Sequence, residues 1–65
     1  MELVGKTVKS KINGKVFHID ETYTDNGHKY YKVREISTGK ILPVHGRLLD
    51  EMCMTYLEIV KENEQ

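Results

Sequence analysis

The chain has 65 residues, a single cysteine, and ten basic and ten acidic side chains that give a formal net charge of zero. This length bounds it to one domain over residues 1–65, and one cysteine excludes an internal disulfide. No stretch approaches the ~20 apolar residues that span a bilayer, so we expect no membrane partner. A single cysteine without a disulfide is typical of a reducing compartment, so we expect a cytoplasmic protein. Residues 62–65 are polar, and we expect them to form a frayed tail.

The charges are unevenly distributed along the chain. Residues 1–47 hold nine Lys or Arg and five Asp or Glu, whereas residues 48–65 hold one Lys and five Asp or Glu. This asymmetry is typical of a basic surface with an acidic tail, although the tail can also simply neutralise the body of the protein.

The first 23 residues predict two strands. Residues 5–12 alternate, with Val8, Ser10 and Ile12 on one face. Asn13-Gly14 then predicts a two-residue hairpin, because type I′ turns require positive φ at both central residues. Across 15–23, strict alternation places Phe17, Ile19 and Tyr23 on one face.

Residues 24–27 predict a second, slightly longer turn before a third strand at 28–36. Tyr31 and Val33 form one face of this strand, and the opposite face carries Tyr30, Lys32 and Arg34. Ile36 falls out of step with Val33, so we expect a bulge near Glu35.

After a turn at 37–40, Pro43 marks 41–44 as an edge strand, because proline lacks a ladder donor. The apolar residues of 46–62 fit one long helix. They also fit a short helix over 47–53 followed by a strand over 55–61, in which Leu57 and Ile59 face the core. We favour the second interpretation, and residues 54–61 can still be helix or strand at this stage.

The predicted fold is mainly β, with about five antiparallel strands and a short helix near residues 46–53. Three stretches carry a likeness to a known fold: residues 5–10, 13–19 and 31–40. Their order resembles an SH3-like small barrel, in the style of short phage and prophage proteins of Gram-positive bacteria. The resemblance implies a barrel that binds a macromolecule.

Residue patterns for catalysis, metals and cofactors are weak. Thr38-Gly39-Lys40 lacks the second glycine of a phosphate loop, and the three histidines are not spaced as zinc ligands. Cys53 lies in an apolar stripe and is expected to be buried. Asp20 and Glu21 are strand neighbours that should point to opposite faces. We therefore expect no enzyme activity, no metal and no cofactor.

Two binding hypotheses remain. In the first, Tyr30, Lys32 and Arg34, with the Asp25-Asn26 loop, bind a protein, as a phage-type regulator binds a host protein. In the second, Lys32 and Arg34 belong to a larger basic face for nucleic acid, with Tyr30 or Tyr31 stacking on bases. The further basic residues of this face are Lys6, Lys9, Lys11, Lys15, Lys29, Lys40 and Arg47. A third alternative is a homo-oligomeric structural component.

Overall fold

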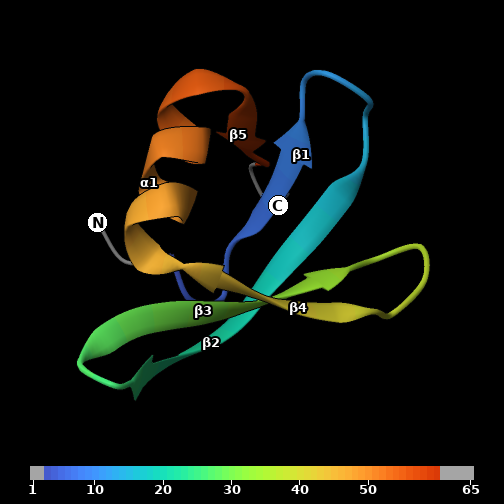
Figure 1. Cartoon of the computed structure of the whole chain (residues 1–65). Coiled ribbons are helices and arrows are strands. Elements are labelled where there is room, and N and C mark those ends of the chain that lie inside the picture. Colours follow the sequence, from blue (N-terminus) through green and yellow to red (C-terminus); the bar gives the residue numbers. More distant parts are fainter. Residues whose placement is uncertain (1–2, 61–65) are drawn as a thin grey trace.

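The computed structural model describes residues 3–60, which form five strands and one helix (Figure 1). The tail expected at 62–65 lies outside the described residues. The elements in chain order are β1 (Thr7–Ser10), β2 (Val16–Asp25), β3 (His28–Glu35), β4 (Ile41–His45), α1 (Gly46–Thr55) and β5 (Leu57–Ile59). All neighbouring strands are antiparallel, in the order β4-β3-β2-β1-β5.

This architecture confirms a mainly β fold with five antiparallel strands and one short helix. The sheet is open, because β4 and β5 are its two edges and do not pair with each other within residues 3–60. The expected closure into an SH3-like barrel is therefore not seen.

The core is a single layer between α1 and the inner face of the sheet. Val8, Ile19 and Leu49 are its most deeply buried side chains, and they come from β1, β2 and α1. Tyr31 and Val33 complete the layer from β3, as their alternation predicts. Because successive side chains of a strand point to opposite sides, the burial of Tyr31 and Val33 places Tyr30, Lys32 and Arg34 on the side of the sheet that faces away from α1.

A bulge at Asp20 changes which side chains of β2 face outward. Ile19 lies opposite Val33, whereas Glu21 lies opposite Lys32, so β2 carries one extra residue at this point. Tyr23 is consequently on the outer face, and the expectation that it shares a face with Ile19 is wrong.

The bulge expected near Glu35 is not there. The pairing of β3 with β2 continues without a shift from Val33 to Glu35. Ile36 lies beyond the end of β3 and is 49% exposed. It therefore does not have to point to the same side of the sheet as Val33, and no bulge is required.

The tight hairpin turn lies at residues 26–27, and not at 13–14 as the dipeptide predicts. Asp25 pairs directly with His28, and Asn26 and Gly27 both have positive φ (57° and 82°), as a type I′ turn requires. At the other site only Gly14 has positive φ, and β1 and β2 are joined by residues 11–15.

The β1–β2 and β3–β4 loops instead share one hydrogen-bonding pattern. In the β1–β2 loop, Ser10 N–H donates to Lys15 O and Gly14 N–H donates to Ser10 O. In the β3–β4 loop, Glu35 N–H donates to Lys40 O and Gly39 N–H donates to Glu35 O. In each loop a side-chain oxygen, from Asn13 or Thr38, accepts the N–H of the residue two positions on. These side chains favour a longer loop over a tight turn. Ile12 lies in the first of these loops and is 74% exposed, so the expectation that it shares the face of Val8 and Ser10 is wrong.

The C-terminal segment is a helix followed by a strand. α1 runs to Thr55 and β5 covers only Leu57–Ile59, so the split interpretation is confirmed with shorter strand bounds. Leu57 and Ile59 face the core as expected. Pro43 lies on edge strand β4, also as expected. Among residues 3–60, no helix has the length and apolar character to cross a membrane.

Candidate functional site

The predicted contact residues of β3 share the outer face of the sheet, the side opposite α1. Tyr30 pairs across the sheet with Tyr23 and His45, and Lys32 pairs with Glu21 and Pro43. We use the name outer face for a set of charged and aromatic residues of β2, β3 and β4 on this side of the sheet: His18, Asp20, Glu21, Tyr23, His28, Tyr30, Lys32, Arg34 and His45.

Arg34 is neutralised by a bidentate ion pair. Its Nε and Nη2 atoms donate to the two carboxylate oxygens of Asp20 at 3.1 and 3.0 Å. The same hydrogen bonds lower the pKa of Asp20 and raise the pKa of Arg34. His18 Nε2 lies 3.9 Å from Asp20, and its Nδ1 is hydrogen-bonded to Thr7 Oγ1 at 3.0 Å. The guanidinium is thereby held in a fixed orientation.

Lys32 is neutralised in the same way. Its ammonium lies 2.9 Å from Glu21 Oε2, and this hydrogen bond raises the pKa of Lys32. The ammonium also lies 5.7 Å from the ring centre of Tyr23, within cation–π range. Asp20 and Glu21 thus both serve the outer face, because the bulge removes the alternation that was expected to separate them.

Four rings form a continuous aromatic surface beside the ion pairs. Tyr23 stacks on Tyr30 at 5.6 Å with an interplanar angle of 18°. His45 meets the edge of Tyr30 at 5.3 Å, and His28 lies 5.4 Å from His45. The stacking follows from the direct pairing of Tyr23 with Tyr30 beyond the bulge.

His45 joins this surface to the helix. It is the last residue of β4 and the N-cap of α1, where its Nδ1 accepts the backbone N–H of Arg47 at 3.2 Å. This bond satisfies one of the helix N–H groups that have no intrahelical partner. His45 therefore lies at the junction of β4 and α1.

Asp25 and Asn26 lie at the tip of the β2–β3 hairpin, where both are exposed. Asp25 pairs with His28, so the loop continues the outer face beyond the stacked tyrosines. The five residues of the first binding hypothesis therefore lie along one hairpin, from Arg34 near the C-terminal end of β3 to Asn26 in the β2–β3 turn.

The basic residues of the second hypothesis are spread over several surfaces. Lys9 lies on β1 and pairs with Val16 of β2 and Glu58 of β5. Lys11 and Lys29 line a hollow beside the helix. Lys29 lies over the ring of Tyr31, and Lys15 is 3.7 Å from Glu35. The remaining members precede β1, follow the β3–β4 loop or begin the helix: Lys6, Lys40 and Arg47.

The described residues contain few groups suited to chemistry. Residues 3–60 hold no cluster of three or more His, Cys, Asp or Glu side chains that could bind a metal ion. Cys53 is half-buried against the core, less than the full burial expected. Burial, followed by the charge of Asp50, raises the pKa of this thiol, which disfavours the reactive thiolate.

Six residues of the outer face were not among the contact residues predicted from the sequence: His18, Asp20, Glu21, Tyr23, His28 and His45. Three of them depend on the bulge at Asp20, which interrupts a segment that reads as unbroken alternation. For His45, the available signal was its position directly before an apolar helical repeat. Comparison of the chain with protein-family models, curated proteins and solved structures finds no match.

Proposed function

We propose that this protein is a non-catalytic protein-interaction module that binds its partner through the outer face, in the manner of a phage-type regulator acting on a host protein. The observation that supports this most is the neutralisation of Lys32 and Arg34. Each cation lies within 3.0 Å of an acidic side chain on β2.

A neutralised face suits a protein surface better than a phosphate backbone. Nucleic-acid binding gains its affinity from cations that replace the counterions of the phosphates. Lys32 and Arg34 are already paired, and a phosphate would lie close to Asp20 and Glu21. Tyrosine and arginine, both present on this face, are residues that protein interfaces favour.

The test is affinity capture from bacterial lysate on the immobilised full chain, with and without nuclease. We expect a protein that is retained after nuclease treatment and is lost on the Tyr30→Ser and Lys32→Glu chains. Lys11→Glu makes the same charge change at an exposed residue in the β1–β2 loop, and should capture normally. Recovery of nucleic acid, or of proteins that disappear with nuclease, would overturn the proposal.

A further inference from the structure

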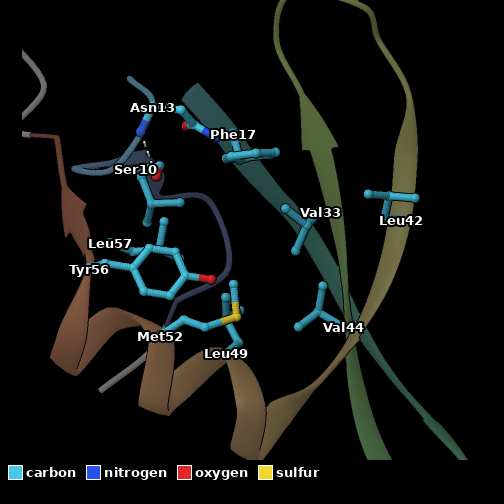
Figure 2. A pocket seen from close by; sticks show the side chains of 11 residues that line it. Ser10, Asn13, Phe17, Val33, Leu42, Val44, Leu49, Met52, Tyr56 and Leu57 are labelled. Atoms are coloured by element: carbon cyan, nitrogen blue, oxygen red, sulfur yellow. Dashed lines mark hydrogen bonds between the residues drawn. The ribbon is translucent and has the colours of Figure 1, made fainter. Parts of the chain in front are cut away.

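A groove lies on the inner side of the sheet, where α1 leaves the sheet uncovered. Its volume is about 230 Å³, and Figure 2 shows Met52 and Tyr56 on the helix side facing Val33, Val44 and Leu42 on the sheet side. Small-molecule sites usually enclose about 300–1,000 Å³, so the groove is too small for a drug-sized ligand. Its apolar lining suits side chains of a bound polypeptide.

The groove reaches edge strand β4. Leu42 lines it and is 46% exposed, and the adjacent Ile41 is 53% exposed on the outer side. These are large apolar side chains on a strand whose second side has no neighbour among residues 3–60. An exposed apolar edge of this kind is a template for an added strand.

The backbone of β4 has hydrogen-bonding groups that point away from the sheet. Glu35 N–H donates to Lys40 O, so that pair is hydrogen-bonded, and the alternation of an antiparallel ladder makes the pairs of Ile41, Pro43 and His45 non-hydrogen-bonded. The N–H groups of Ile41 and His45 and the carbonyl oxygens of Ile41 and Pro43 therefore point outward.

Cations flank this edge at both ends. Lys40 directly precedes β4, Arg47 follows it by two residues, both are exposed, and neither forms a salt bridge with another residue in the 3–60 range. The outer-face cations, in contrast, are neutralised. The charge at β4 is therefore complementary to an acidic segment.

A second copy of the chain fits this edge poorly. In the symmetric antiparallel pairing centred on Pro43, each proline would lie opposite the other and no N–H would be available at the centre. The same register would bring Lys40 of one copy close to Arg47 of the other, which places like charges together at both ends.

From these observations we propose that β4 binds an extended segment of another protein as a sixth strand. The segment carries alternating apolar side chains, one of which enters the groove beside Leu42, and acidic residues that reach Lys40 and Arg47. The inference rests on the proposed function as a protein-interaction module, and it adds a second contact surface with a stated partner chemistry.

The test uses a random twelve-residue peptide library displayed on phage and selected against the immobilised full chain. We expect enriched peptides in which apolar residues alternate and Asp or Glu lies at the ends. Synthetic versions of these peptides should shift the backbone amide resonances of Ile41, Leu42, Val44 and His45 in NMR spectra of the full chain.

Variants separate the contributions of charge and groove. The Lys40→Glu/Arg47→Glu chain should bind the selected peptides about tenfold more weakly, whereas Lys6→Glu/Lys11→Glu, with the same change in net charge, should bind within about twofold. Leu42→Glu should abolish binding. Because all these side chains are exposed, circular dichroism should show that each variant remains folded.

Failure of this inference differs from failure of the proposed function. Peptides without acidic residues, peptides that still bind Leu42→Glu, or an absence of enrichment would each overturn the strand-addition proposal. If the lysate partner is lost on Lys32→Glu but retained on Leu42→Glu, the interaction module stands and its partner does not use β4. If nuclease-treated lysate yields no protein at all, the proposed function fails.

Discussion

Two adjacent leucines of α1 provide a direct test of the face that the helix presents to the sheet. Leu49 is 1% exposed and belongs to the core, whereas Leu48 is 51% exposed. Replacing either by alanine makes the same chemical change within the same helix. The contribution of helix propensity is therefore matched, and the difference in stability reports burial.

The expected difference is large for a protein of this size. Replacement of a buried leucine by alanine costs about 2–5 kcal/mol. Leu49 lines the groove, where neighbouring side chains can relax, so we expect a loss of about 3 kcal/mol in the free energy of unfolding. A chain of this length has a total of roughly 3–10 kcal/mol. Leu48→Ala should change stability by no more than about 0.5 kcal/mol.

The assay is urea denaturation of the two variants and the parent chain, followed by far-ultraviolet circular dichroism. With a slope of about 1 kcal/mol per molar urea, Leu49→Ala should lower the midpoint by about 3 M or unfold the protein outright. A loss for Leu48→Ala equal to or greater than that for Leu49→Ala would refute the helix orientation. It would also refute the division of the sheet into inner and outer faces.

Three further predictions concern the outer face and Cys53. His45→Ala should destabilise the protein by about 1 kcal/mol in the same assay through loss of the N-cap, while His45→Asn, which retains an acceptor, should cost less. The pKa of Asp20 is lowered by Arg34, so the unfolded chain binds protons more readily than the folded one. Stability should therefore fall as the pH drops below the ordinary value of 3.8, and Asp20→Asn should make this fall shallower in acid titrations. Since burial, and then the charge of Asp50, raises the pKa of Cys53, iodoacetamide should alkylate it more slowly than a free thiol at neutral pH, and Asp50→Asn should increase the rate. An unchanged acid profile or alkylation at the free-thiol rate would contradict the latter two predictions.

The sequence predicted the parts of the fold that depend on local alternation. The division of β3 into inward Tyr31 and Val33 and outward Tyr30, Lys32 and Arg34 follows from a two-residue period that tertiary packing leaves intact. The split of the C-terminal segment also follows locally, from the concentration of strand-favouring residues after Thr55.

The features that the sequence did not predict depend mainly on pairing between residues that lie far apart in the chain. The bulge at Asp20 has no local signal, because the register of β2 against β3 is set jointly by the turn at Asn26-Gly27 and by burial of Ile19 against Val33. The two ion pairs and the Tyr23–Tyr30 stack all follow from this one extra residue. The two-residue turn predicted from Asn13-Gly14 is wrong because the Asn13 side chain accepts the N–H of Lys15 in a longer loop.

The central claim is that the paired charges of the outer face suit a protein partner and not nucleic acid. The most direct measurement is fluorescence anisotropy of a labelled single-stranded oligonucleotide titrated with the full chain at low and at physiological salt. We expect weak binding at low salt and none at physiological salt, with little change on Lys32→Glu. Tight binding that persists at physiological salt and is lost on Lys32→Glu would contradict it.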